Sequence, residues 1–145
     1  PDEIPVNPRQ YLARQTPDAG SPASPGSGNW VWPTQGRLTQ YFAWYHPALD
    51  IANKQTSPVV AADSGRVVLV SAGRVGYGNH VIVDHGNGFS TLYGHLASFN
   101  VSHGQNVAKG AVLGVMGSTG RSTGNHLHFE IRLNGIAQNP LAYLK

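Results

Sequence analysis

The sequence predicts a compact, all-β domain built mostly of antiparallel strands. Charged residues make up only 12% of the 145 residues, about half the usual share. Glycine occurs 18 times and proline 10 times, and no long stretch has a helical period. Few charges and many turn-forming residues favour short strands joined by tight turns. The chain is long enough for one domain with a sizeable core.

The N-terminal residues 1–28 differ in composition from the rest of the chain. Residues 16–28 are rich in proline, serine and glycine and contain almost nothing to bury. We therefore expect residues 1–28 to be a linker or a processed N-terminal segment, and residues 29–145 to form the domain. Because the chain begins at Pro1, we expect further N-terminal domains outside it.

Several short apolar runs in the domain are strand candidates. An apolar opening at residues 30–33 and a second apolar stretch at 38–44 come first, followed by a short loop from His46 to Asp50. Glycine, Asn-Gly and proline separate the later candidates. In chain order these candidates are residues 59–62, 65–71, 80–84, 89–96, short strands within 101–114, residues 112–116 and 126–131, a turn at 134–135 and a closing segment at 139–143.

The clearest hairpin has Asn87 and Gly88 between two β-rich runs. Asn-Gly in this setting is the strongest short hairpin signal. If these two residues form the whole loop, His80 lies opposite His95. Tyr93 and His95 would then share one face of their strand, whereas a longer loop would change the pairing.

Residues 126–131 alternate between polar and apolar side chains. Leu127, Phe129 and Ile131 would face a core, while the opposite face would present two imidazoles and a carboxylate, from His126, His128 and Glu130. An ordinary amphipathic strand with surface histidines is the plain alternative. Two histidines at this spacing can also both reach one metal ion, or one can bind it while the other acts beside it.

The other histidines strengthen the interpretation as a metal site. The chain has seven histidines and no cysteine, so a metal site must use imidazole and carboxylate ligands. His46 and Asp50 converge if the chain between them turns tightly. Together with one histidine of the His-Leu-His sequence they would give three ligands and an open fourth position, which is typical of a catalytic zinc site.

The charge and hydropathy of the chain argue against two other classes of protein. The net charge is +3, but the basic residues are scattered and have no aromatic residues interleaved with them, so nucleic-acid binding is not expected. No apolar run has the length of a membrane span.

Residues from about 32 to 144 resemble the lysostaphin-type, or LytM-like, zinc metallopeptidases that cut peptidoglycan peptides. The resemblance rests on segments that match in order, at residues 45–52, 76–79, 84–88, 91–96, 107–110, 117–120 and 122–131. It implies an all-β fold of the hybrid β motif type, with an open substrate groove over an antiparallel sheet. It also implies one Zn²⁺ per chain and a secreted or bacterial cell-envelope location, in the periplasm or cell wall. Ala48 and Asn125 depart from the family pattern, where glycine and proline are common, and neither change removes a ligand.

By this resemblance His46, Asp50 and His128 are the zinc ligands, and His95 and His126 are the two catalytic histidines. We favour His126 as the base, because it lies next but one to a ligand, although the sequence leaves the division of roles open. Further residues could act as support for a ligand or as substrate contacts: Tyr93, Glu130, His80 and Asn125. The bond cut could be Gly–Gly or one next to a D-amino acid.

Two other functions remain as alternatives. Some family members have lost ligands and act as activators of other wall hydrolases, so a cell-wall-binding or activating module is the first. The segment 101–114 also resembles the strand-turn pattern of biotinyl, lipoyl and phosphotransferase carrier domains. A biotin carrier would need a modifiable lysine in a tight turn with methionine neighbours, which Met116 does not provide.

Overall fold

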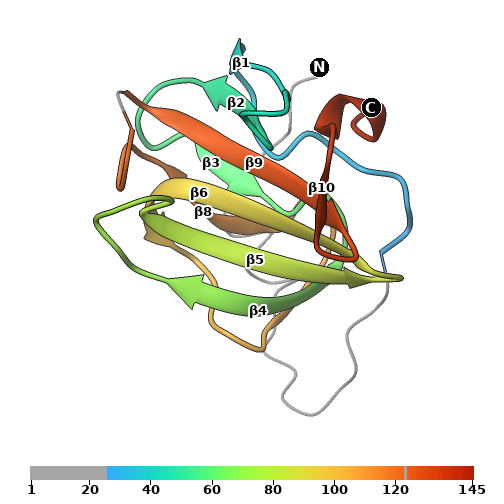
Figure 1. Ribbon diagram of the computed structural model, residues 1–145. Helices are drawn as coiled ribbons and strands as arrows, with labels where there is room; N and C mark the ends of the chain where they lie inside the picture. Colours follow the sequence, from blue (N-terminus) through green and yellow to red (C-terminus); the bar gives the residue numbers. More distant parts are fainter. Residues whose placement is uncertain (1–25, 123) are drawn as a thin grey trace.

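A computed structural model describes residues 26–122 and 124–145. Within these residues the chain forms ten strands of one sheet and a single 3-10 turn, and every strand pair is antiparallel (Figure 1). The predicted all-β, antiparallel fold is therefore confirmed. The elements are β1 (Arg37–Gln40), β2 (Leu49–Ala52), β3 (Pro58–Val60), β4 (Gly65–Ser71), β5 (Asn79–Gly86), β6 (Phe89–Phe99), β7 (Asn106–Val107), β8 (Val112–Met116), β9 (His126–Leu133), β10 (Ile136–Gln138) and η1 (Pro140–Ala142).

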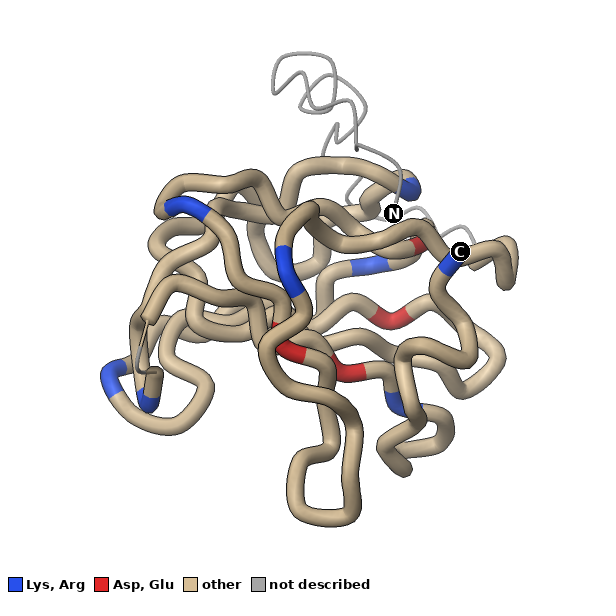
Figure 2. The backbone as a smooth tube through the Cα atoms, turned by 90° about the horizontal axis from the view of Figure 1, so that it is seen from above, with Lys and Arg blue, Asp and Glu red and all other residues tan. Residues whose placement is uncertain are grey.

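The long strand β6 organises the sheet. Its first half lies between β5 and β9, and its second half, from Leu96 to Phe99, pairs with β8, which in turn pairs with β3. The main path runs β1-β2-β9-β6-β5-β4-β7, and β10 pairs with β9. In Figure 1 β3 and β8 lie behind β6 and β9, so the sheet has a second layer. The lysines and arginines are distributed over several separate places on the fold (Figure 2).

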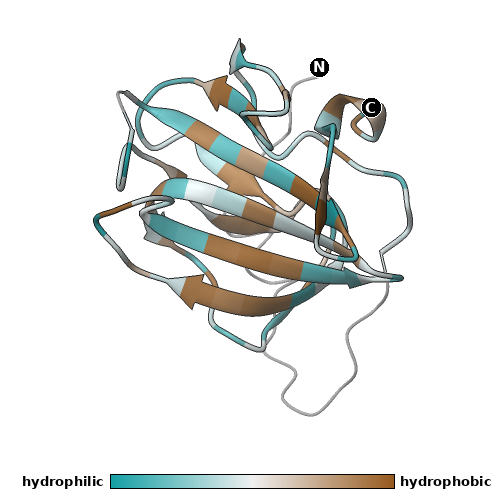
Figure 3. Ribbon diagram, viewed as in Figure 1, coloured by the Kyte–Doolittle hydropathy of each residue, from teal (hydrophilic) through white to brown (hydrophobic). Residues whose placement is uncertain are grey.

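The core lies on one face of β9 and β6. Leu127, Phe129 and Ile131 are fully buried, and the Phe129 ring packs 5.4 Å from the ring of Tyr93. Figure 3 shows the resulting alternation of hydrophilic and hydrophobic residues along β9. The opposite face of β9 carries the two histidines and Glu130, as the sequence pattern predicts.

The β5–β6 hairpin has the expected two-residue loop but not a constant register. Gly86 faces Phe89, and Asn87 and Gly88 have φ of 54° and 84°, as a type I′ turn requires. The pairing shifts between Asp84 and Gly86 and again between Asn79 and Val81. A single register could not be extrapolated from the loop, because each bulge moves the pairing by one residue.

The backbone of His95 corrects another expectation. Tyr93 and His95 were expected on one face, but His95 has φ of 62°, in the left-handed region. Its amide donates to the carbonyl of Tyr77 at 2.7 Å, outside the regular ladder. Tyr93 faces the core, while the imidazole of His95 lies beside the histidines of β9.

The N-terminal edge of the described chain is attached to the sheet. The Gly26 amide donates to the His85 carbonyl at 2.6 Å, and the Gly28 amide donates to Asp63 Oδ2 at 2.9 Å. Trp30 forms a parallel bridge with Leu144. Most of the predicted linker, residues 1–25, lies outside the described residues. Among the described residues, no helix is long and apolar enough to cross a membrane.

Candidate metal centre

Two adjacent strands bring the central pair of polar side chains together. Asp50 lies on β2 directly opposite His128 on β9. The loop expected from His46 to Asp50 therefore ends earlier than predicted, because Leu49 and Asp50 already belong to a strand. Side chains directly opposite each other in a sheet project to the same face. The register of β2 and β9 thus fixes the relative position of these two groups.

His46 completes a group of three possible metal ligands. Its Nε2 lies 3.2 Å from Asp50 Oδ2, and His128 Nδ1 lies 3.2 Å from Asp50 Oδ1. One ligand atom from each of the three residues lies within 4.8 Å of the others. Their side chains are only 11%, 9% and 12% exposed. Two imidazole nitrogens and one carboxylate form the donor set of a zinc site with an open position.

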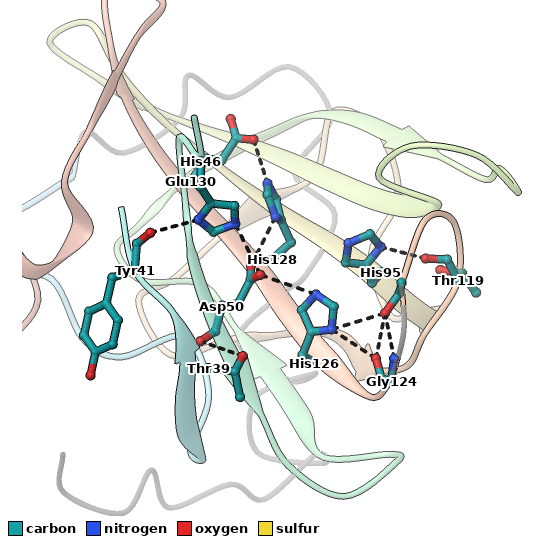
Figure 4. A network of polar contacts seen from close by, with 11 residues as sticks. Thr39, Tyr41, His46, Asp50, His95, Thr119, Gly124, His126, His128 and Glu130 are labelled. Carbon is teal, nitrogen blue, oxygen red and sulfur yellow. Dashed lines mark hydrogen bonds and ion pairs between the residues drawn. The ribbon is translucent and has the colours of Figure 1, made fainter. Parts of the chain in front are cut away.

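Each of the four imidazoles around Asp50 has one nitrogen held by an acceptor (Figure 4). His46 Nδ1 donates to the Tyr41 carbonyl at 3.1 Å, and His128 Nε2 donates to Glu130 Oε2 at 2.8 Å. The other two nitrogens, His126 Nδ1 and His95 Nδ1, donate to the carbonyls of Gly124 at 3.0 Å and Thr119 at 2.7 Å. An acceptor of this kind sets the tautomer and leaves the second nitrogen unprotonated for a metal or a proton.

The electrostatics around Asp50 fit a bound cation. Asp50 Oδ1 is buried, and apart from the ion-pair contact with His128 Nδ1 at 3.2 Å it has no hydrogen-bond partner among the described residues. Burial would lower the pKa of His128, but the hydrogen bonds and charges of Asp50 and Glu130 outweigh it and raise this pKa to about 9. A proton on His128 thus offsets part of the negative charge of the two carboxylates. A metal ion bound through Nδ1 would replace that proton.

His95 and His126 flank the three ligand candidates. Their rings lie 4.8 Å apart, and His126 Nε2 is 3.7 Å from Asp50 Oδ2. Burial lowers the pKa of His95, and the neighbouring imidazoles add to this effect, although its hydrogen bond to Thr119 opposes it. His95 is therefore neutral near pH 7, with Nε2 available as a proton acceptor.

A buried cluster supports His128 from behind. Glu130 is 1% exposed, and its Oε1 accepts hydrogen bonds from Arg132 Nε at 2.9 Å and from Arg132 Nη2 at 2.7 Å. Arg132 also donates to the Tyr77 hydroxyl at 3.3 Å, and the Tyr77 ring lies 5.3 Å from that of His128. The ligand face of His128 is thus positioned by a carboxylate, a guanidinium and an aromatic ring.

The three ligand candidates and the two flanking histidines all line one pocket of about 550 Å³, which we call the central pocket. The five residues are His46, Asp50, His128, His95 and His126. Tyr77 and Arg121 contribute to its walls. Next to it is a second hollow of about 730 Å³, which we call the flanking hollow. It shares Thr39 and His126 with the central pocket. Its other lining residues are 36–37, 52–54 and 124–125. The two cavities adjoin at Thr39 and His126, and together they are called the groove below.

Two residues that the sequence suggested for the site lie elsewhere. Tyr93 is fully buried in the core, where its hydroxyl hydrogen-bonds to Thr91 and accepts from the Ala62 amide, so it cannot contact a substrate. His80 does not line the central pocket; its ring packs against Tyr77 at 5.2 Å and its Nδ1 donates to the Gly78 carbonyl. Glu130 supports His128, and Asn125 lines the flanking hollow.

Tyr77 and Arg132 were not among the site residues that the sequence predicted. The segment Gly76–Asn79 was one of the matching segments, which was the available signal for Tyr77. Arg132 lies two residues after Glu130 on β9, at the next position of the polar face. Continuing that pattern would have placed it on the same face.

Similarity to known proteins extends over most of the described domain. The profile of peptidase family M23 matches residues 44–140. The chain is 47% identical to DD-carboxypeptidase/endopeptidase Mpg of Neisseria meningitidis over 97 residues, which is 67% of this chain and 22% of that protein. It is 37% identical to murein hydrolase activator NlpD of Escherichia coli over 118 residues, or 79% of this chain and 31% of that protein. The chain thus spans about a fifth to a third of the length of these curated relatives.

Solved structures show the same fold. A zinc-containing peptidase from Vibrio cholerae superimposes with a TM-score of 0.72 at 26% identity, covering 81% of this chain and 39% of that one. The antimicrobial peptidase lysostaphin from Staphylococcus simulans superimposes with a TM-score of 0.66 at 30% identity, covering 80% of this chain and 49% of that one.

Proposed function

The chain belongs to peptidase family M23, and from that premise we propose that it is a zinc-dependent endopeptidase. Its substrate is proposed to be a peptide bond in the stem peptides or cross-bridges of bacterial peptidoglycan. The observation that carries the proposal is the set of His46, Asp50 and His128 in a pocket that also contains two further imidazoles. A structural metal site would have no need of those two.

In this proposal His46, Asp50 and His128 would hold one Zn²⁺, through Nε2, a carboxylate oxygen and Nδ1 respectively. When bound, zinc supplies Lewis-acid activation of water and of a peptide carbonyl. The carbonyl of Tyr41 and the carboxylate of Glu130 keep the two imidazoles in the ligating tautomer.

The two remaining histidines handle protons. His126 Nε2 faces Asp50 and is unprotonated when Nδ1 donates to Gly124, so we assign it as the base that takes the proton from the attacking water. His95, held through Nδ1 by Thr119, is assigned to stabilise charge on the carbonyl oxygen or to protonate the leaving amine after its Nε2 has accepted the proton that the neighbouring His126 removes from water. Both assignments require these nitrogens to face the substrate.

The alternative function is that of a non-catalytic module that binds the wall or activates another hydrolase. The similarity to NlpD, which is named as a murein hydrolase activator, favours it. The presence of all three ligand candidates and both accessory histidines argues against it. We also propose a secreted or bacterial cell-envelope location, and further N-terminal domains outside this chain, because the relatives are longer and act in peptidoglycan metabolism by name.

Metal analysis together with peptidoglycan digestion tests the proposal. The chain should contain about one zinc per molecule and should release peptides from purified peptidoglycan. His128→Ala should lose both properties, and His126→Ala should keep zinc but lose hydrolysis. Zinc binding without hydrolysis of peptidoglycan from any source would refute the enzyme and leave the activating module.

A further inference from the structure

The flanking hollow carries two cations that the proposed chemistry does not use. Arg37 on β1 and Lys54 after β2 both line it, and both are exposed. No described carboxylate lies within ion-pair distance of either side chain. Two unpaired cations in one hollow create a positive potential that attracts an anion.

The sheet register fixes where this charge lies relative to the proposed metal site. Arg37 is opposite Ala52 on β2, and Ala52 is opposite His126 on β9. These three residues therefore project to the same face of the sheet. Two strand spacings place the Cα of Arg37 about 10 Å from that of His126. An extended peptide covers that distance with about three residues.

The other groups of the groove do not cancel this charge. Among the described residues, Asp50 is the only carboxylate that lines either the central pocket or the flanking hollow. A divalent ion at the central site would leave that end of the groove positive as well. Asn125 adds an amide whose side chain makes no hydrogen bond with another described residue, so it can donate to an anion.

The loop that carries Lys54 is held in place by its own hydrogen bonds. Asn53 Nδ2 donates to the Gln35 carbonyl at 3.1 Å, and the Lys54 amide donates to Asn53 Oδ1 at 2.7 Å. The Ser57 hydroxyl donates to the Lys54 carbonyl at 2.7 Å. The backbone beneath the hollow is therefore built before a ligand arrives, which lowers the entropic cost of binding.

We propose that Arg37 and Lys54 form a carboxylate-binding subsite. It selects peptides that carry a free carboxylate about three residues from the bond placed at the central pocket, over uncharged Gly–Gly bridges. The inference that an anion binds here is argued from the flanking hollow alone. The inference about where the carboxylate lies relative to the cleaved bond rests on the proposed function. A guanidinium can hold both carboxylate oxygens, while the lysine adds a point charge.

Binding measurements on the zinc-loaded chain test this proposal. Two labelled stem-peptide analogues with a non-hydrolysable bond would be compared by fluorescence anisotropy, one with a free carboxylate and one with the corresponding carboxamide. We expect the carboxylate peptide to bind about five- to tenfold more tightly, as about one tenfold step suits exposed charge pairs. The double variant R37Q/K54Q should lose this preference. The matched control R74Q/K145Q removes the same charge at exposed positions outside both cavities and should keep it.

Each outcome has a definite meaning. A preference lost only in R37Q/K54Q supports the subsite. No preference, a preference that survives in R37Q/K54Q, or an equal loss in both variants overturns it, the last result indicating attraction by net charge alone. Peptidoglycan digestion is scored separately: a preserved carboxylate preference without hydrolysis would refute the proposed enzyme while the anion-binding subsite stands.

Discussion

Replacing Glu130 by glutamine tests how far zinc binding depends on residues behind the ligands. Glu130 Oε2 accepts the hydrogen bond from His128 Nε2 at 2.8 Å, and Oε1 is held by Arg132. Burial would raise the pKa of Glu130, but hydrogen bonds from His128, Tyr77 and Arg132 outweigh it and lower this pKa. The group is therefore a carboxylate, and Glu130→Gln removes a charge while almost preserving the shape.

The size of the effect follows from the loss of one charge-assisted hydrogen bond. Such a bond contributes about 1.5–3 kcal/mol, which corresponds to about a 10- to 150-fold change in an equilibrium constant. Residues that orient a ligating histidine typically change metal affinity by about 10- to 100-fold. We therefore expect the zinc Kd of Glu130→Gln to rise by about 10- to 100-fold.

Competition with a chromophoric chelator measures this Kd directly. Asp84→Asn is the matched control, because Asp84 is an exposed carboxylate on β5 outside the site and its replacement changes the net charge by the same amount. The control should bind zinc as the parent does. An unchanged Kd in a folded Glu130→Gln protein would refute the argument that Glu130 orients His128.

Three further predictions concern proton transfer, packing and pH. His126→Ala and His95→Ala should each retain zinc, measured by elemental analysis, and should each lower peptidoglycan hydrolysis by at least about 100-fold, because general acid–base groups contribute that much. Trp30→Ala should reduce the free energy of unfolding by about 3–5 kcal/mol in urea titrations, because this 3% exposed ring packs edge-on against His85, Phe89 and Tyr143. Burial lowers the pKa of His85 in the folded state, although hydrogen bonding to Ser64 opposes it, so the unfolded chain binds a proton first near pH 6.5. The stability contributed by neutral His85 should be complete above about pH 6.5 and fall as the pH drops toward the lowered value, and His85→Gln should remove this part of the pH dependence.

Each of these predictions has a contradicting result. Full hydrolysis by His126→Ala would remove it from the proton-transfer scheme. A Trp30→Ala protein with parental stability would mean that the N-terminal edge contributes little to the core. An NMR titration that finds the pKa of His85 at or above 6.5 would contradict the burial argument, whatever the stability data show.

The sequence predicted the side-chain pattern of β9 because that pattern is local. The alternation of Leu127, Phe129 and Ile131 with polar residues predicts which face of the strand is buried, and this holds whichever strands pair with it. The Asn87-Gly88 loop was equally local, since its two positive φ values depend only on those two residues. The resemblance to a known family then supplied residues that no periodicity could connect, such as His46 and His95.

Non-local features were the ones that could not be predicted. β1 has only four residues, of which Leu38 alone is apolar, so its place beside β2 comes from pairing and not from composition. The left-handed backbone at His95 depends on a hydrogen bond from its amide to Tyr77. Strict alternation along β6 therefore predicted that Tyr93 lies at the site with His95. It could not predict the left-handed backbone of His95, which turns the imidazole toward the site.

The sheet register fixes the position of the proposed zinc ligands but not that of the proposed carboxylate-binding subsite. Asp50 and His128 are opposite each other in the ladder, so their separation does not depend on any loop conformation. A slip of one residue between β2 and β9 would move either group to the core face, and burying Leu127 and Phe129 opposes that slip. Arg37 and Lys54 have no such constraint, because they lie on an edge strand and in a turn where exposed side chains can be exchanged at little cost in stability. Changes at those two positions should therefore alter which peptide binds, while the register beneath them keeps the proposed zinc ligands in place.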